Sequence, residues 1–215
     1  MWIFTVEGNI GAGKSTLLSS LQNLQNLQFK KPHKVIQEPV DEWTQETNND
    51  SSILELYYAD RKRYAFTFQM FALQTRFEHM HNIIKNNPDT IIICERCPLT
   101  DLEIFAKMLF DSKQISEVEM NIYKRWYDFM NMLIGPKIKG VLYLRMPIST
   151  CASRIIKRNR KGEGNITMEY LHSLHDQHET WLQNPELPYK VHEIEWSEEK
   201  GYNFERLVGF INEMI

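Results

Sequence analysis

The amino-acid sequence predicts an α/β fold with a five-stranded parallel sheet flanked by helices. Five short β-like runs alternate with long segments of helical periodicity, which is typical of a parallel sheet. Residues 91–93 are consecutive isoleucines without polar alternation, as expected for a strand buried on both faces. A glycine-rich turn follows the first run directly, where the chain is expected to pass from a strand into a helix.

The same periodicities give the bounds of the expected elements. The expected strands are residues 2–6, 34–37, 90–94, 140–144 and 191–195. The expected helices are residues 15–27, 53–86, 99–110, 117–133, 148–159, 168–183 and 204–214. The chain has 215 residues, of which 42% are hydrophobic, and no Pro/Gly/Ser-rich linker divides it, so residues 1–215 are expected to form one domain.

The glycine-rich turn fits the phosphate-binding loop pattern, in which Gly, four further residues and Gly-Lys-Ser follow a strand. Glycines let successive backbone N–H groups turn inward around phosphate oxygens, Lys14 can reach the β and γ phosphates, and the Ser15 hydroxyl can ligate Mg²⁺. The N-terminus of the following helix would also face the phosphates. We therefore expect a P-loop NTPase fold that binds ATP or GTP, rather than an accidental turn. The loop residues are Gly8, Asn9, Ile10, Gly11, Ala12, Gly13, Lys14, Ser15 and Thr16.

Composition excludes several classes of partner. The net charge of −3 gives no broad basic field, so a nucleic-acid polymer is not the expected ligand. No apolar run approaches the roughly 20 residues of a membrane span, and the first strand leaves no room for a signal or transit peptide. We expect a cytoplasmic protein without a membrane partner. The odd number of cysteines (Cys94, Cys97 and Cys151) favours ordinary thiols over a disulfide framework or a zinc site.

Charged residues follow the predicted strands at the point where each strand ends. Glu38-Pro39-Val40 follows the second strand, Glu95-Arg96 the third and Arg145 the fourth. Ligands of open parallel sheets bind beyond the carboxyl ends of the strands, so these charges would share one cleft with bound phosphates. Glu38 and Glu95 are candidates for orienting or deprotonating an attacking hydroxyl, unless they are solvated strand-end charges. Arg96 can pair with Glu38 across neighbouring strand ends.

An arginine-rich segment near residue 158 has the composition of a lid. Arg154 and Arg158 are four residues apart and therefore share a helix face, and Arg160 follows them. Glycines at 162 and 164 would let the segment close its guanidinium groups over transferring phosphate. The alternative is a solvated basic helix end, which the phosphate loop in the same chain disfavours.

The long helix expected at residues 53–86 carries a polar stripe. Tyr58, Gln69, Ala72 and Arg76 fall within roughly 60° of one another on a continuous helix. This stripe suits a planar polar ligand such as a nucleobase better than a core contact. If the helix breaks near Asp60, Tyr58 need not share a helix face with the other three residues, which would still share one with each other.

Together these motifs resemble the deoxyribonucleoside kinase family, in particular its animal deoxycytidine and deoxyguanosine kinase branch. The resemblance covers nearly the whole chain, with several separate motifs in the family's order. It is carried by residues 8–16, Glu38-Pro39-Val40 with Trp43, Tyr58, Phe66-Thr67-Phe68-Gln69, Glu95-Arg96, Asp101, the lid at 154–163 and Glu169-Tyr170-Leu171.

The resemblance implies an ATP-dependent kinase of nucleotide salvage that transfers the γ-phosphoryl to the 5′-hydroxyl of a deoxynucleoside. It implies that Glu38 is the general base for this hydroxyl, that Arg96 helps to hold the hydroxyl and the γ-phosphate, and that lid arginines neutralise charge in the transition state. Ser15 and Glu95 would hold Mg²⁺. The implied catalytic residues are Lys14, Glu38, Arg96, Arg154 and Arg158.

For the acceptor, the resemblance implies that Tyr58 and Glu163 bind the sugar 3′-hydroxyl, while Gln69 reads the base and Phe105 stacks on it. The implied substrate-binding residues are Glu38, Trp43, Leu54, Tyr58, Phe68, Gln69, Ala72, Arg76, Arg96, Asp101, Phe105 and Glu163. For ATP, the implied residues are the loop 8–16 with Arg154, Arg158 and Arg160, and an adenine site near residues 196–200 that includes Glu198, Glu199 and Lys200.

Arg76 and Asp101 also bear on the choice of base. They resemble the branch that accepts deoxycytidine or purine deoxynucleosides, whereas the thymidine-preferring branch has apolar residues at these positions. Such a pair supplies fixed donors and acceptors at the base edge and leaves little apolar room for the thymine methyl. We expect deoxycytidine and/or purine deoxynucleosides to be favoured over thymidine. Cys97, Gly162 and Tyr57 depart from the family's usual residues, and Tyr57 can narrow the pocket.

Other readings of the same residues are open. A nucleoside monophosphate kinase of the thymidylate kinase type shares the fold, loop and lid, although Glu38-Pro39-Val40 and Glu163 favour a nucleoside acceptor. A GTPase would need an Asn-Lys-x-Asp motif, which this sequence lacks. A noncatalytic family relative is the third alternative, although the loop lysine and the candidate base are present. By resemblance we also expect a homodimer formed through the helices at 99–110 and 117–133.

Overall fold

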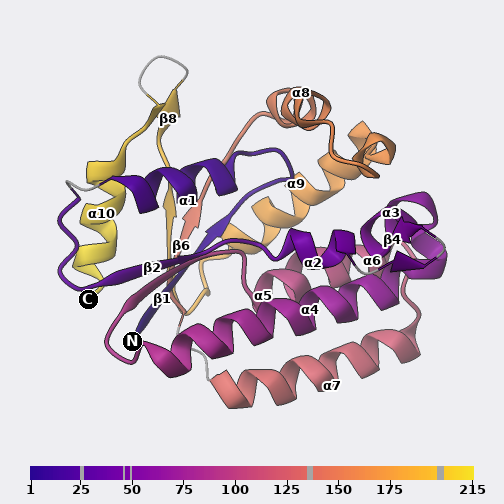
Figure 1. Ribbon diagram of the computed structural model, residues 1–215, viewed down its shortest axis with the longest axis horizontal. Helices are drawn as coiled ribbons and strands as arrows, with labels where there is room; N and C mark the ends of the chain where they lie inside the picture. Colours follow the sequence, from indigo (N-terminus) through magenta and orange to yellow (C-terminus); the bar gives the residue numbers. More distant parts are fainter. Residues whose placement is uncertain (25–26, 46, 49, 135–137, 198–200) are drawn as a thin grey trace.

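A computed structural model describes residues 1–24, 27–45, 47–48, 50–134, 138–197 and 201–215 of the protein. At its centre is a five-stranded parallel sheet in the order β2-β5-β1-β6-β7 (Figure 1). The predicted fold class is confirmed, and the strand bounds differ from the expected ones by one or two residues. The strands are β1 (Trp2–Glu7), β2 (His33–Ile36), β5 (Ile91–Glu95), β6 (Ile138–Tyr143) and β7 (Lys190–Glu193).

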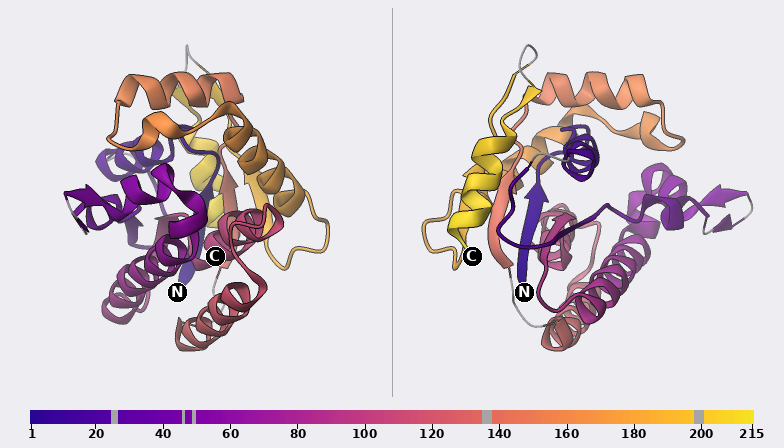
Figure 2. Two further views of the ribbon diagram at one scale, coloured as in Figure 1. Left: turned by 90° about the vertical axis from the view of Figure 1, so that its right-hand side faces the viewer. Right: turned by 60° about the vertical axis from the view of Figure 1, so that its left-hand side comes forward.

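Helices cover both faces of this sheet (Figures 1 and 2). On one face, α1 (Lys14–Asn23) and α10 (Phe204–Glu213) pack their buried aliphatic side chains against apolar side chains of β1, β5 and β6. The other face is covered by α4 (Arg61–Asn86), α9 (Met168–Leu182) and the helical residues 98–111, while α7 (Glu117–Ile134) packs outside this layer against α4 and residues 101–106. β5 is buried along its whole length, as its unbroken isoleucine run predicts.

Several short elements gather toward the carboxyl ends of the strands. They are α2 (Val40–Gln45), the pair β3 (Thr47–Asn48) and β4 (Ser51–Ser52), α8 (Ile148–Arg158), the 3₁₀ turn η2 (Glu163–Asn165) and the hairpin of β8 (Trp196–Ser197) and β9 (Gly201–Tyr202). In Figure 1, α8 and the hairpin lie at the end of the sheet opposite both chain termini. This end of the sheet is where a parallel α/β fold places its ligands.

The prediction of one long helix at residues 53–86 is wrong in one respect, because the structure has two helices there, α3 (Ile53–Ala59) and α4. Asp60 leaves the helical conformation (φ −141°, ψ 82°), and its side chain accepts a hydrogen bond from the Arg63 backbone N–H at 3.0 Å. Aspartate competes for backbone N–H groups in this way and so favours a helix start over a helix interior. Ser52 and Glu55 form a capping box at the start of α3. Tyr58 therefore lies on a different helix from Gln69.

The helix expected at residues 99–110 is also irregular. It consists of α5 (Pro98–Thr100), a π-helical segment η1 (Asp101–Ala106) and α6 (Lys107–Asp111). A π-turn widens the helix by one residue and changes the direction of the side chains that follow, and such turns are frequent at functional sites. Asp101 and Phe105 are both buried on this segment.

Two further features bear on earlier expectations. No helix in the described part of the chain is long and apolar enough to cross a membrane. Cys94, Cys97 and Cys151 are free thiols, and all three are buried.

Candidate active site

The phosphate-binding loop adopts a backbone that requires glycine. Gly8 and Gly11 have positive φ angles of 145° and 78°. A Cβ atom would lie 2.6 Å from the Leu144 carbonyl oxygen at Gly8 and 2.4 Å from the Cys151 carbonyl oxygen at Gly11. The loop is therefore packed closely against the end of β6 and against α8, and only glycine fits at these two positions.

Lys14 and Ser15 lie at the start of α1; Lys14 is buried inside the loop, and Ser15 is exposed. Lys14 Nζ donates to the carbonyl oxygens of Gly8 at 3.1 Å and Asn9 at 2.9 Å. Burial and the nearby Arg96 lower the pKa of Lys14 to about 8, so this side chain is still mainly a cation at pH 7. Ser15 Oγ donates to Glu95 Oε2 at 2.8 Å, which places a hydroxyl and a carboxylate side by side at the mouth of the loop.

The loop borders a pocket of about 490 Å³ that the lid also lines. Arg154 Nη1 donates to the Ala12 carbonyl oxygen at 2.7 Å, and its guanidinium lies 4.8 Å from the Trp196 ring centre. Tyr202 Oη donates to the Gly13 carbonyl oxygen at 3.2 Å. The β8–β9 hairpin therefore lies beside the loop. Glu198, Glu199 and Lys200, predicted at the adenine, fall outside the described residues. The lining is Gly11, Gly13, Lys14, Ser15, Thr16, Glu95, Arg154, Arg158, Arg160, Trp196 and Tyr202.

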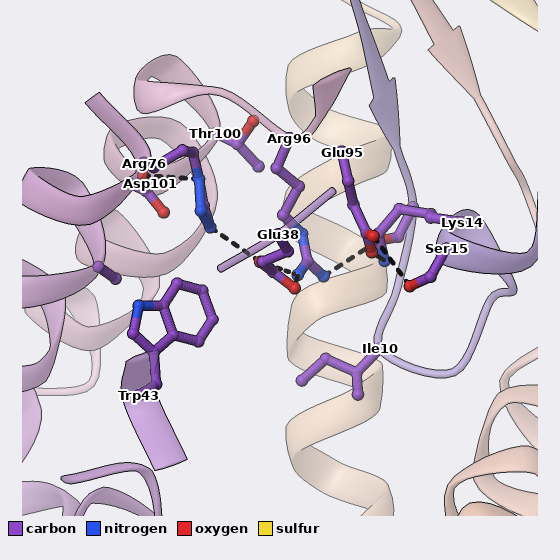
Figure 3. A network of polar contacts seen from close by, with 12 residues as sticks. Ile10, Lys14, Ser15, Glu38, Trp43, Arg76, Glu95, Arg96, Thr100 and Asp101 are labelled. Carbon is purple, nitrogen blue, oxygen red and sulfur yellow. Dashed lines mark hydrogen bonds and ion pairs between the residues drawn. The ribbon is translucent and has the colours of Figure 1, made fainter. Parts of the chain in front are cut away.

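Glu38 lies between two buried guanidinium groups, as Figure 3 shows. Arg96 Nη1 donates to Glu38 Oε1 at 2.8 Å and Oε2 at 3.0 Å, while Arg76 Nη2 donates to Oε1 at 2.8 Å. The predicted pairing of Arg96 with Glu38 is present. Arg96 Nη2 also donates to the Gly8 carbonyl oxygen at 3.3 Å, so Arg96 joins the carboxylate to the phosphate loop.

The charges around Glu38 decide its protonation. Burial acts to raise the pKa of Glu38, but the charges of Arg96 and Arg76 outweigh burial and hold that pKa below its usual range. Glu38 is therefore a carboxylate at neutral pH. The ion pair from Arg76 Nε to Asp101 Oδ2 measures 3.1 Å. Burial nevertheless raises the pKa of Asp101 to about 7, against the opposing charge of Arg76.

A second pocket opens beside Glu38, and its lining contains every residue predicted to bind the acceptor. Tyr58 lines this pocket together with Gln69, Ala72 and Arg76, although the helix breaks between them. The pocket is also lined by residues from α2, η1 and the lid. The residues that were predicted to bind the acceptor and that line this pocket are Glu38, Trp43, Leu54, Tyr58, Phe68, Gln69, Ala72, Arg76, Arg96, Asp101, Phe105 and Glu163.

Several buried polar atoms in this pocket have no hydrogen-bond partner among the described residues. They are Gln69 Oε1, Arg76 Nη1, Arg96 Nε and the two atoms of the Arg76–Asp101 ion pair, Arg76 Nε and Asp101 Oδ2. A buried polar group without a partner is costly, so these atoms suit a ligand that presents its own donors and acceptors. Aromatic rings supply the apolar part of the wall, with Trp43 and Phe68 in edge-to-face contact at 5.4 Å.

The lid touches the acceptor pocket as well as the loop pocket. Arg158 makes two hydrogen bonds of 2.7 Å with Glu163, and Arg160 Nη1 donates to the same carboxylate at 3.1 Å. Glu163 is 4% exposed, so this carboxylate is buried under the lid arginines. Gly162 turns the chain here with a φ of 87°. The lid therefore connects the predicted sugar-binding carboxylate with the predicted phosphate-binding arginines.

Tyr170 is a pocket residue that was not predicted to bind the acceptor. Tyr170 on α9 lines the acceptor pocket, and its hydroxyl lies 2.9 Å from the hydroxyl of Tyr57 on α3. Tyr57 in turn stacks on Phe68 with ring centres 4.6 Å apart. Tyr57 departs from the family's usual residue, but no sequence pattern around Tyr57 predicts a contact with Tyr170, which is 113 positions away.

Comparison with known proteins decides the family. A family model described as deoxynucleoside kinase matches residues 4–215. The chain belongs to the deoxynucleoside kinase family. It is 35% identical to a probable deoxycytidine kinase of fowlpox virus over 89% of this chain and 76% of the relative. It is 33% identical to human deoxycytidine kinase, over 83% of this chain and 74% of the relative. A mitochondrial deoxyguanosine kinase of Xenopus laevis is also 33% identical, over 83% of this chain and 72% of the relative.

These matches confirm the predicted family and the predicted activity. The protein is a deoxynucleoside kinase, a phosphotransferase that acts on deoxynucleosides. They do not favour the alternative of a nucleoside monophosphate kinase or of a noncatalytic relative. The roles of individual residues stay predictions, which the geometry above makes specific.

Replacing Gly11 by alanine tests the loop geometry of this deoxynucleoside kinase. The added Cβ would meet the Cys151 carbonyl oxygen at 2.4 Å in a backbone of positive φ, so the loop must shift. We expect ATP affinity, measured by titration calorimetry, to fall at least about ten-fold. Gly209→Ala is the control, because no atom lies within 4 Å of the Cβ that this change adds. The ATP affinity of this variant should equal that of the wild type. Equal ATP affinity in Gly11→Ala and the wild type would contradict the packing described for this loop.

Proposed function

We propose that this kinase transfers the γ-phosphoryl of ATP to the 5′-hydroxyl of deoxycytidine and/or purine deoxynucleosides, in preference to thymidine. The observation that carries the proposal is the position of Glu38. Its carboxylate lies in the acceptor pocket, and Arg96 links it to the phosphate loop through the Gly8 carbonyl oxygen. An acceptor hydroxyl that donates to Glu38 would therefore face the phosphates of a donor in the loop.

Glu38 acts on the hydroxyl in two ways in this proposal. As a carboxylate it accepts the hydrogen bond of the 5′-hydroxyl and orients the oxygen toward the γ-phosphorus. It then takes the proton as the bond to phosphorus forms. Arg96 holds the carboxylate in place and adds positive charge next to the phosphoryl group. Phosphoryl transfer depends mainly on such positioning and charge, so no covalent intermediate with the protein is required.

Lys14, Arg154 and Arg158 supply the cationic surround of the donor phosphates, because all three line the loop pocket. Ser15 and Glu95 fit Mg²⁺, since a hydroxyl and a carboxylate 2.8 Å apart are hard oxygen donors. When bound, this ion neutralises charge on the phosphate oxygens. Trp196 and Tyr202 of the hairpin line the same pocket, which places the proposed adenine site beside the donor phosphates in this proposal.

The preference for a base rests on Arg76 and Asp101. Both are buried, at 5% and 1% exposure, and both line the acceptor pocket together with Gln69. A charged pair and an amide recognise a polar base edge by hydrogen bonds, and an apolar methyl in contact with them would leave buried polar atoms without partners. Thymidine is disfavoured for this reason.

We also propose a homodimer formed through α7. Along one side of this helix large apolar side chains are exposed, which is unusual for the surface of a monomer. They are Val118, Ile122, Trp126, Phe129, Met132 and Leu133. The other predicted interface helix, residues 99–110, does not offer such a face. Its side chains Ile104, Phe105, Ala106, Met108 and Leu109 are buried in the protomer's own core.

Three broader expectations belong to the same proposal. We propose that residues 1–215 work as one domain, because apolar clusters on both faces pack on the same sheet. A cytoplasmic location and a role in nucleotide salvage complete the proposal.

Phosphate transfer from labelled ATP to a panel of acceptors tests the proposed reaction. The panel contains deoxycytidine, deoxyadenosine, deoxyguanosine, thymidine and their 5′-monophosphates. We expect transfer to nucleosides, with thymidine the poorest, and little or none to monophosphates. Transfer only to the monophosphates would contradict the proposed acceptor.

Replacement of Glu38 by glutamine tests the proposed base. The amide keeps the size of the side chain but cannot accept the proton, so turnover should fall by about 100-fold or more while nucleoside binding is retained. Glu42→Gln is a matched control, since Glu42 on α2 is 40% exposed and pairs with His79 outside the pocket. Wild-type turnover in Glu38→Gln would remove Glu38 as the base.

Combined replacement of Arg76 by methionine and Asp101 by alanine tests the base preference. Removing the charged pair makes apolar room for the thymine methyl, so the ratio of thymidine to deoxycytidine kcat/KM should rise at least about ten-fold. Arg63→Met serves as the control, because Arg63 is exposed on the same helix and its ratio should not change. An unchanged ratio in the double variant would show that this pair does not select the base.

Substitution of Trp126 by glutamate tests the proposed dimer. A charge in the middle of the exposed apolar face should convert a dimer into a monomer in light scattering. Ile156→Glu is the control, since Ile156 is 77% exposed on α8, away from this face, and should leave the dimer intact. A wild-type protein that is already monomeric at micromolar concentration would contradict the dimer.

A further inference from the structure

One guanidinium spans the base end and the hydroxyl end of the acceptor pocket. Arg76 Nη2 donates to Glu38 Oε1 at 2.8 Å, and Arg76 Nε lies 3.1 Å from Asp101 Oδ2 (Figure 3). Arg76 is 5% exposed, and its guanidinium lies 5.4 Å from the centre of the Trp43 ring. The side chain proposed to read the base therefore also holds the carboxylate proposed to receive the hydroxyl proton.

The two arginines on Glu38 have different surroundings. Arg96 reaches the phosphate loop, because its Nη2 donates to the Gly8 carbonyl oxygen at 3.3 Å. Arg76 has no such contact with the loop, and its other charged partner is Asp101 on the base side. The Arg76 contact is thus the one that a nucleobase can change.

That contact weakens Glu38 as a proton acceptor. Oε1 receives hydrogen bonds from both guanidinium groups, which occupies acceptor positions of a carboxylate that must also accept the 5′-hydroxyl. Two adjacent cations stabilise the ionised carboxylate and so oppose its protonation. Removing one cation restores basicity, and Arg96 alone still holds the side chain by both oxygens.

A base with a polar edge can draw Arg76 away. Arg76 Nη1 and Gln69 Oε1 have no hydrogen-bond partners among the residues that the structure describes. A base edge that offers an acceptor to the guanidinium and a donor to the amide oxygen supplies the missing hydrogen-bond partners of both groups. A guanidinium is planar and presents its donors in a fixed fork, so pulling Nη1 onto the base also moves Nη2 relative to Glu38.

We propose that Arg76 is a positioning residue that couples recognition of the base to the action of Glu38. It restrains the carboxylate until the polar edge of an acceptor base engages the guanidinium, and then leaves Glu38 to Arg96 and the 5′-hydroxyl. This inference rests on the proposed function. It makes the base edge a determinant of the rate of phosphoryl transfer, whereas a residue that only reads the base would change affinity alone.

Single-turnover transfer rates at saturating ATP and acceptor test the coupling. Two acceptors are compared: deoxycytidine, and a phenyl deoxyriboside that keeps the sugar and an aromatic ring but has no polar edge. In the wild type, deoxycytidine should react at least about ten-fold faster at saturation. In Arg76→Met, the two rates should become equal within about two-fold, chiefly because the phenyl deoxyriboside reacts faster.

Two further variants keep the test sharp. Arg76→Lys places a single ammonium that cannot span both contacts, so its two rates should also converge, which guards against misfolding of the methionine variant. Gln69→Met removes a base contact without touching Glu38, and its rates should stay at least about ten-fold apart while the KM for deoxycytidine rises.

The outcomes separate the coupling from the proposed reaction. Equal saturating rates for the two acceptors in the wild type would overturn the coupling, and so would a ten-fold difference that persists in both Arg76 variants. Failure of the wild type to phosphorylate deoxycytidine or any other nucleoside would instead overturn the proposed function on which the coupling rests.

Discussion

The site depends on a buried carboxylate held between two buried guanidinium groups. Glu38 follows β2, Arg96 follows β5 and Arg76 comes from α4, so the contact joins segments that are far apart in sequence. Removing the Glu38 carboxylate would leave the two guanidinium charges without their shared partner, and breaking a buried ion pair in this way costs roughly 3–5 kcal/mol. The relative positions of β2, β5 and α4 are therefore restrained by electrostatics as well as by apolar packing.

The backbone around Arg96 is built to keep this contact. Arg96 has a positive φ of 57°, which a side chain of this size rarely adopts. Its N–H donates to the Val6 carbonyl oxygen at 3.1 Å and so continues the pairing of β5 with β1. Just beyond, Thr100 Oγ1 donates to the buried Glu7 Oε1 at 2.6 Å and accepts from the Cys97 N–H at 3.0 Å. The turn that aims Arg96 is thus anchored to the strand that leads into the phosphate loop.

Much of this could be predicted from the sequence because parallel strands place their ends together. The loop at residues 8–16, Glu38 and the Glu95-Arg96 pair each follow a strand, and strand order then brings them to one edge. The residues of the predicted polar stripe still line one pocket despite the helix break at Asp60. The reason is that α3 packs against α4, so that Tyr58 lies beside the residues of α4. The break arises because the Asp60 side chain caps the start of α4 instead of continuing the helix. The apolar periodicity of a sequence does not show such a capping hydrogen bond.

Other features depend on tertiary contacts and leave no pattern in the sequence. The π-turn at residues 101–106 shifts helical phase by one residue and cannot be distinguished from an ordinary helix by apolar spacing. The contact between Tyr57 and Tyr170 joins two helices, and the second contact of Arg76 depends on which face of α4 meets Glu38. Resemblance to a family predicted that Arg76 takes part in base recognition, but the hydrogen bond from Arg76 to Glu38 is visible only in the folded structure.

A crystal structure of the complex with deoxycytidine, Mg²⁺ and a non-hydrolysable ATP analogue tests the central place of Glu38 most directly. We expect the nucleoside 5′-oxygen within about 3 Å of the Glu38 carboxylate, with Arg96 still paired to it and the γ-phosphorus in line with that oxygen. A 5′-oxygen bound away from Glu38, with the carboxylate still held only by the two arginines, would contradict the role given to this residue.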